Sequence, residues 1–165
     1  MRSEPRRLDW PGVRSSLRRS GFTLPTDARP FWFGDDPQMA HDLGMLVRRG
    51  TKTATAGLAD AWRSEANGLP RTGQIFVVLD WEGDPLGVIR NTAVDVIPFE
   101  DVGAEFAAAE GEGDGSLEWW REAHWKYFSR ECQDLGVEPD VRMLVVCQRF
   151  EVLWPRDGRT RDVAR

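Results

Sequence analysis

The sequence predicts an α+β fold in which a small mixed sheet or barrel is covered by helices. Two β-rich runs, 74–79 and 87–97, flank a turn and indicate a hairpin. Helical spacing of apolar residues extends over 37–49 and 117–135, and a strongly apolar strand, 143–153, comes last. This order lacks the regular alternation of strands and helices found in a doubly wound sheet, so we expect a mixed sheet with helices packed outside it.

The two longer helices have clear start and stop signals. Asp36 is a good N-cap, Pro37 suits the first helical position, and Gly50 suits the stop. Ser116 and Gly136 mark the start and the end of the second helix in the same way. Two shorter helices are expected at about 57–66 and 100–109.

Length and composition exclude several protein classes. A chain of 165 residues with 41% hydrophobic and 30% charged residues is typical of one globular domain. No apolar run approaches the ~18 residues that span a bilayer, and no apolar segment follows the basic N-terminus as in a secretion signal. We therefore expect no membrane partner. Cys132 and Cys147 lie outside any Cys-x-x-Cys motif, so we expect both to be core thiols of a protein in the reducing cytoplasm.

The charge is unevenly distributed along the chain. The formal net charge is −5, yet residues 1–20 hold six arginines against two acids. We therefore expect a basic Pro/Arg-rich tail over 1–30, a domain over 31–154 and a basic tail over 155–165. The acidic domain argues against a broad duplex-binding face, although the tails could touch phosphates.

Lys52 is one of only two lysines among 22 basic residues. It lies in the fragment Gly50-Thr51-Lys52-Thr53, but Met45 replaces the first glycine of a phosphate loop, so that interpretation fails. Lys52 and Thr55 are three positions apart, and on a helical turn they would share a face as a base and a nucleophile. The alternative is a turn with a solvated lysine.

An acidic run follows the second short helix. Glu110, Glu112 and Asp114 alternate with glycines and could bind a hard cation, act as catalytic carboxylates or form a flexible loop. Because three carboxylates repel one another, a nearby cation is favoured, and Lys52 is the obvious one.

The long helix is rich in flat side chains. Trp120, His124 and Tyr127 share a face on which a nucleobase could stack. An aromatic core face with an internally bonded His124 is the other interpretation.

These segments together resemble the ASCH family. The matching pieces are Phe33-Gly34-Asp35, the stretch 46–55, Pro98-Phe99-Glu100-Asp101-Val102, the stretch 106–114, and Trp120-Arg121-Glu122-Ala123-His124 with Tyr127-Phe128. They occur in the family's order and extend over about residues 31–154. The resemblance implies a PUA-like small mixed β-barrel with flanking helices, and an RNA- or nucleoside-recognising cleft.

Two activities known in the family follow as expectations. One is removal of the acyl group from N4-acylated cytidine, for which the resemblance implies Lys52, Thr55 and Glu110 as catalytic residues. Either Lys52 is the base that activates Thr55, or Glu110 is the base and Lys52 stabilises the oxyanion.

The other activity is cleavage of single-stranded RNA, and a binding module without turnover is the third alternative. In either case Trp120, His124 and Tyr127 would hold the bases. Arg90 and Arg149 would meet phosphates. No cofactor or metal is expected.

Overall fold

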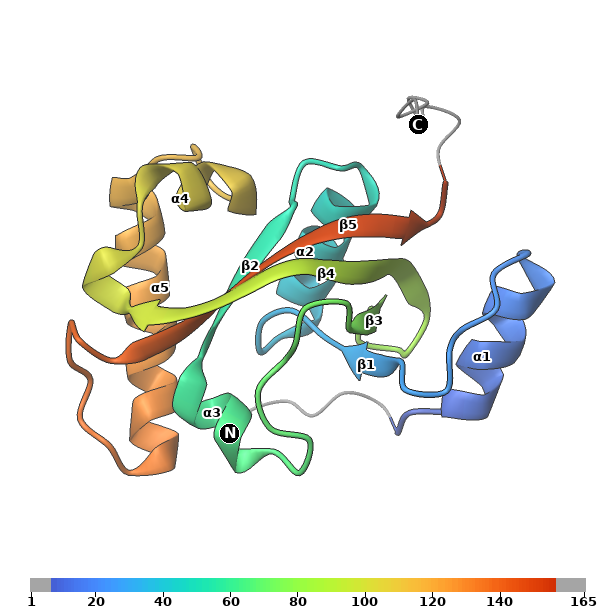
Figure 1. The fold of residues 1–165 in the computed structure, drawn as a ribbon, viewed down its shortest axis with the longest axis horizontal. Coiled ribbons are helices and arrows are strands. Elements are labelled where there is room, and N and C mark those ends of the chain that lie inside the picture. Colours follow the sequence, from blue (N-terminus) through green and yellow to red (C-terminus); the bar gives the residue numbers. More distant parts are fainter. Residues whose placement is uncertain (1–6, 157–165) are drawn as a thin grey trace. The chain divides into compact units, whose positions relative to one another are not determined.

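The computed structural model describes residues 7–156, and the outermost parts of both predicted tails, 1–6 and 157–165, lie outside the described residues. The strands follow the order β1-β3-β4-β5-β2 in a five-stranded sheet (Figure 1). They are β1 (Arg29–Phe31), β2 (Ala54–Leu58), β3 (Ile75–Leu79), β4 (Pro85–Pro98) and β5 (Leu144–Trp154). The helices are α1 (Trp10–Arg19), α2 (Pro37–Arg48), α3 (Ala59–Ser64), α4 (Ala104–Glu110) and α5 (Leu117–Leu135), with a 3-10 turn η1 (Phe99–Asp101).

The described chain divides into two compact units. The first contains residues 7–50, 75–90 and 151–156, and the second contains 51–74 and 91–150. None of the helices among the described residues is long and apolar enough to cross a membrane.

In the first unit, β3 pairs with β1 in parallel and with the first half of β4 in antiparallel register. The segment expected to be an N-terminal tail contains α1, whose Val13 and Leu17 are buried. They belong to a cluster that also includes Val77 and Val88 of the hairpin strands. This part of the sequence therefore contributes to the core of the first unit.

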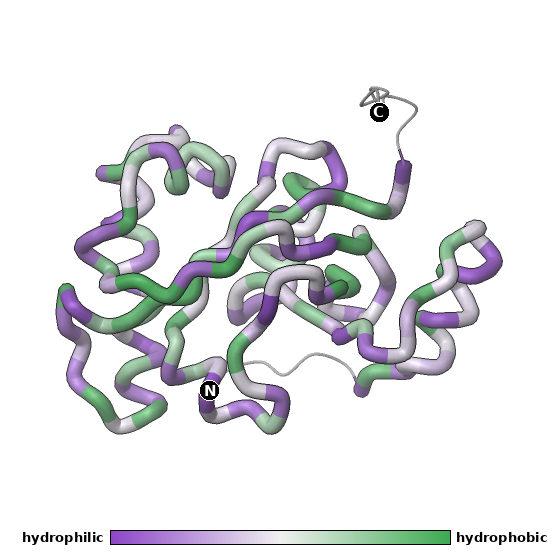
Figure 2. The backbone as a smooth tube through the Cα atoms, in the orientation of Figure 1, coloured by the Kyte–Doolittle hydropathy of each residue, from purple (hydrophilic) through white to green (hydrophobic). Residues whose placement is uncertain are grey.

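In the second unit, β2 pairs with β5 in antiparallel register. Both α4 and α5 contact β2 (Figure 1). Ala54 and Leu58 of β2 and Val145 of β5 share one core cluster with Trp120 and Phe128 of α5. The beginning of β5 is strongly apolar, as Figure 2 shows.

Local sequence signals set the longer helices. The Asp36 side chain accepts from Met39 N–H at 2.9 Å, and the Ser116 hydroxyl accepts from Trp119 N–H at 3.1 Å. The left-handed Gly136 ends α5, with φ of 71°. The predictions of both helices, the hairpin and the last strand are confirmed. The observed bounds of these elements lie within two residues of the predicted ones.

Two predictions of shorter helices are wrong in part. The segment 57–66 begins as the end of β2, and only Ala59–Ser64 is helical, because pairing with β5 overrides its local preference. The segment 100–109 is split into η1 and α4. The strands β1 and β2 were not predicted, since each is short and depends on a distant partner.

Candidate functional site

Backbone contacts join the loop before β2 to the end of α4. The Thr53 amide donates to the carbonyl oxygen of Ala109 at 2.9 Å, and the Thr53 hydroxyl donates to the same oxygen at 3.1 Å. Gly111 ends α4 with φ of 66°, and a Cβ at this position would lie 2.3 Å from the Thr51 carbonyl oxygen. Only glycine suits both the conformation and the close approach. Lys52 and Glu110, 58 positions apart in the sequence, are thereby brought together.

The Lys52 side chain is fully buried, and two carboxylates hold its amine. Its Nζ donates to Glu110 Oε2 at 2.6 Å and to Glu112 Oε1 at 2.5 Å. Burial by itself lowers the pKa of Lys52, but the negative charges of Glu110 and Glu112 raise it, and the net pKa lies above its ordinary value. Lys52 is therefore an ammonium ion at neutral pH.

Glu110 is 1% exposed and is surrounded by donors. Its Oε2 accepts from Lys52, and its Oε1 accepts from the indole N–H of Trp120 at 2.9 Å. Burial alone would raise the pKa of Glu110, but the charge of Lys52 and the hydrogen bond from His124 lower it to about 2. The carboxyl group of Glu110 is therefore ionised at neutral and mildly acidic pH.

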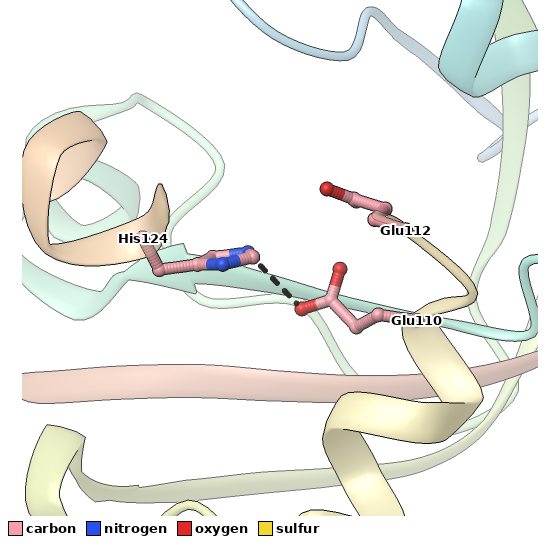
Figure 3. A group of neighbouring side chains, drawn as sticks. All are labelled: Glu110, Glu112 and His124. Atoms are coloured by element: carbon pink, nitrogen blue, oxygen red, sulfur yellow. Dashed lines mark ion pairs between the residues drawn. The ribbon is translucent and has the colours of Figure 1, made fainter. Parts of the chain in front are cut away.

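His124 faces Glu110 from α5, as Figure 3 shows. Its Nδ1 lies 2.9 Å from the Trp120 carbonyl oxygen, an atom that only accepts, so Nδ1 carries a proton. Its Nε2 lies 3.3 Å from Glu110 Oε1. Nε2 is therefore the ring nitrogen that His124 presents to the Glu110 carboxylate.

Glu112 differs from Glu110 in its access to solvent. It lies in the turn after α4, between Gly111 and Gly113, and its side chain is 14% exposed. Burial raises the pKa of Glu112 and so does the charge of Glu110, and the opposing effect of Lys52 does not cancel them. Glu112 therefore binds a proton more readily than an exposed glutamate.

Glu110, Glu112 and His124 offer three atoms within 4.8 Å of one another that have the chemistry of metal ligands (Figure 3). The Lys52 ammonium, however, already contacts both carboxylates, so a cation at this position would have to displace it. We therefore interpret the two carboxylates as the ion-pair partners of Lys52.

Thr55 lies on β2, so the helical turn predicted for Lys52 and Thr55 is wrong. Its partner in the register is Gln148 of β5, and both residues are buried. Gln148 in turn accepts a 3.0 Å hydrogen bond from the Asn91 side chain. Strand alternation directs Thr55 away from the face of Ala54, which packs under the helices. Its function as a nucleophile stays a prediction.

Trp120 and Tyr127 take different positions on α5. Trp120 is 1% exposed and stacks on His124, with ring centroids 4.1 Å apart, and on Phe99 at 5.4 Å. In this position the ring of Trp120 is not accessible to a nucleobase, and its indole N–H donates a hydrogen bond to Glu110. Tyr127 is half-buried, beside the guanidinium of Arg130. The core interpretation of this helix face therefore fits Trp120 and His124 best, and substrate binding by Tyr127 stays a prediction.

The two arginines expected to meet phosphates are both partly exposed. Arg90 belongs to the first unit and forms an ion pair with Glu151. Arg149 belongs to the second unit, where its guanidinium lies over the Phe106 ring at 5.5 Å and 3.8 Å from Glu105. Their role toward phosphates stays a prediction.

One residue of the site is missing from the set that the family resemblance implies. Glu112 is among the possible catalytic carboxylates of the acidic run, but the resemblance implies only Glu110, although Glu112 binds Lys52 as closely as Glu110 does. Its alternation with Glu110 was the available signal. Asp114, the third member of the run, instead accepts from the Ser116 amide at 2.8 Å.

Comparison with known proteins identifies the fold. The family model of the ASCH domain matches residues 29–154. An ASCH domain from Lactobacillus crispatus superposes with a TM-score of 0.76 at 34% identity, covering 86% of this chain and 92% of the other. A protein from Enterococcus faecalis gives a TM-score of 0.72 at 35% identity, covering 84% and 83% of the two chains. Among curated proteins no significant match is found.

These matches confirm the predicted α+β, PUA-like fold with flanking helices. The family match begins two residues before the expected domain start, at the first residue of β1. The chain belongs to the ASCH domain family, whose PUA-like fold is often linked to RNA binding.

Proposed function

We propose that this ASCH protein is a hydrolase that recognises a nucleoside or RNA and removes the acyl group from N4-acylated cytidine. One observation supports the proposal above all others: a fully buried lysine lies between two carboxylates. Burying each ion costs several kcal/mol, so charges gathered in this way are a poor means of stabilising a domain. Groups with shifted pKa values are instead typical of catalytic sites.

The charges of the cluster favour one of the two mechanisms that the sequence left open. Since the pKa of Lys52 is raised, its amine holds its proton and is a poor base. A carboxylate of the cluster is then the base, and the ammonium is a fixed positive charge near the reacting carbonyl. Such a charge lowers the energy of the oxyanion that forms when the acyl carbon is attacked.

The reaction requires one proton acceptor that later becomes a donor. The carboxylate takes the proton of the attacking hydroxyl, which belongs to Thr55 or to water, as the bond to the acyl carbon forms. When the bond from this carbon to N4 breaks, the electron pair stays on N4 and the same carboxyl returns its proton there. With water as the attacking group, the products are the carboxylic acid and cytidine. If Thr55 attacks, a water molecule must then hydrolyse its ester.

The test uses the purified chain and N4-acetylcytidine. We expect equal amounts of cytidine and acetate, and a kcat/KM lower by on the order of 10²-fold in Lys52→Arg, since the planar guanidinium cannot take the place of the buried ammonium. Glu122→Gln is the control, because Glu122 is exposed on α5 and pairs only with Lys126 in the described contacts. No cytidine release by the wild-type chain refutes the proposal, and an unchanged rate in Lys52→Arg refutes the role of Lys52.

Thr55→Val distinguishes the two nucleophiles. If Thr55 attacks, this variant loses nearly all turnover and the wild-type chain forms an acylated intermediate that mass spectrometry detects. If water attacks, the rate stays within a few-fold of wild type and no acylated chain is found.

Single-stranded RNA, with and without a chelator, is the second substrate to be tested. RNA cleavage without cytidine release would replace the amidohydrolase by a ribonuclease. Saturable RNA binding that survives Lys52→Ala, with no product from either substrate, would instead identify a binding module.

A further inference from the structure

We propose that Glu112 is the carboxylate that exchanges protons with the substrate, and that Glu110 is a positioning residue that remains ionised and holds Lys52. The catalytic part of this inference rests on the proposed function. The distribution of protons in the cluster is a property of the free protein and can be measured without a substrate.

The first argument is that Glu110 has no oxygen left for a substrate. Its Oε2 is bound by Lys52 at 2.6 Å, while its Oε1 is bound by Trp120 at 2.9 Å and faces His124 at 3.3 Å. Lys52 and Trp120 are donors, and the Glu110 side chain is almost completely buried. A carboxylate that accepts from several fixed donors is held in its charged form. A proton on either oxygen of Glu110 would displace a group that already contacts that oxygen.

The second argument is that Glu112 is bound on one side only. Within the described residues its Oε1 accepts from Lys52 at 2.5 Å, and no hydrogen bond to its Oε2 is found. Its side chain is also the only one of the four in the cluster that is more than about a tenth exposed, at 14%. Glu112 is therefore the carboxylate that a ligand or water can reach.

The third argument is the charge balance around Glu112. Lys52 faces it from the loop before β2, Glu110 from the end of α4, and His124 from α5. Two carboxylates therefore share the Lys52 ammonium, and the His124 ring lies beside them. Adding one proton to Glu112 changes this balance without breaking the contacts of Glu110. The positive shift in the pKa of Glu112, caused by burial and by Glu110, agrees with this assignment.

In the proposed reaction Glu112 starts as a carboxylate and takes the proton of the attacking hydroxyl. The protonated Glu112 then gives this proton to N4 as the bond from the acyl carbon to N4 breaks, so that no proton is gained or lost over the cycle. A base whose pKa lies nearer to the working pH than that of an ordinary glutamate suits both steps. Glu110 takes no part in the transfer and keeps the Lys52 ammonium in place.

The experiment titrates the carboxyl carbons of protein labelled with 13C at the glutamate δ position. We expect one signal to titrate at higher pH than the exposed glutamates, and this signal to be missing in Glu112→Gln. In Glu110→Gln the same signal should titrate at lower pH, because the negative charge of Glu110 raises the pKa of Glu112. A purely structural role of Glu110 would not produce that shift. If Glu110→Gln does not fold, the wild-type and Glu112→Gln spectra decide the assignment.

Rates of N4-acetylcytidine hydrolysis complete the test. Glu112→Gln should lower kcat by 10²-fold or more and remove the acidic limb of the pH profile. Glu122→Gln, which removes an exposed glutamate from α5, should change neither the high-pH signal nor the rate.

The two proposals fail in different ways. If no acylcytidine is hydrolysed although Glu112 titrates as described, the reaction is refuted and the proton assignment stands. If hydrolysis occurs but the high-pH signal belongs to Glu110, or Glu112→Gln keeps the wild-type rate, the inference is refuted and the proposed function stands.

Discussion

Replacing Lys52 by methionine should destabilise the chain strongly at neutral pH. Methionine has nearly the same length and fills the same space, so the main effect is loss of the charge between Glu110 and Glu112. Leaving one partner of a buried ion pair uncompensated costs about 3–5 kcal/mol. At about 2–4 °C for each kcal/mol, Tm should fall by roughly 6–20 °C.

The measurement is denaturant unfolding followed by circular dichroism at pH 7 and pH 5. The loss of stability in Lys52→Met should be smaller at pH 5, because a proton on Glu112 then replaces part of the missing positive charge. The matched control is Lys126→Met. It removes the other lysine, whose 2.7 Å ion pair with Glu122 lies on the surface, and should leave the midpoint unchanged.

A second change identifies the cause. Adding Glu112→Gln to Lys52→Met removes one of the two uncompensated charges and should restore part of the lost stability. If Lys52→Met is no less stable than Lys126→Met, or if the double variant is less stable than Lys52→Met, then repulsion between buried carboxylates is not what the lysine prevents.

Three further predictions concern the frame around the cluster. Gly111→Ala should lower the free energy of unfolding by more than Gly136→Ala, because both glycines have positive φ but only Gly111 would place a Cβ 2.3 Å from the Thr51 carbonyl oxygen. We expect Gly136→Ala to lower the free energy of unfolding by about 1–2 kcal/mol, measured by thermal unfolding. An equal loss in Gly111→Ala and Gly136→Ala would refute the clash at Gly111. The free energy of unfolding should fall as the pH is lowered from about 4.5 toward 2, by up to about 3 kcal/mol, since the folded chain holds the pKa of Glu110 at about 2 and the unfolded chain takes up the proton first. The free energy of unfolding should fall less steeply with decreasing pH in Glu110→Gln. If it falls as steeply in this variant as in the wild-type chain, the prediction is contradicted. Trp120→Phe keeps an aromatic ring at this position but removes the indole donor to Glu110 Oε1, so the pKa of Glu110 should rise, which 13C titration measures.

The sequence predicts the elements that carry their own start and stop signals. For α5, Ser116 and Gly136 give both ends, because capping and the left-handed glycine are local properties. The strand β2 has no such signal. Four of its five residues, Ala54–Leu58 without Thr55, are small or weakly β-forming, and the segment is extended because β5 pairs with it. An interaction between residues about ninety positions apart cannot be recognised from local preference.

The candidate site also has features that the sequence predicts and features that depend on contacts between distant residues. The need of the acidic run for a cation, and Lys52 as that cation, could be inferred from charge alone. The different burial of Glu110 and Glu112 depends on the turn at Gly111, which buries the first carboxylate under α5 and leaves the second partly open. The contact of the Trp120 indole with Glu110 also requires the packing of α5, so the sequence could only offer base stacking and core packing as alternatives.

Because Lys52 is buried, chemical labelling of its amine can measure how often the chain opens locally. Of the chain's two side-chain amines, the one on Lys126 is open to acylating reagents in the folded protein, whereas the other is sealed from them. Covalent labelling of position 52 would therefore record only those molecules in which the loop has separated from the acidic turn, and its rate would give the frequency of that opening.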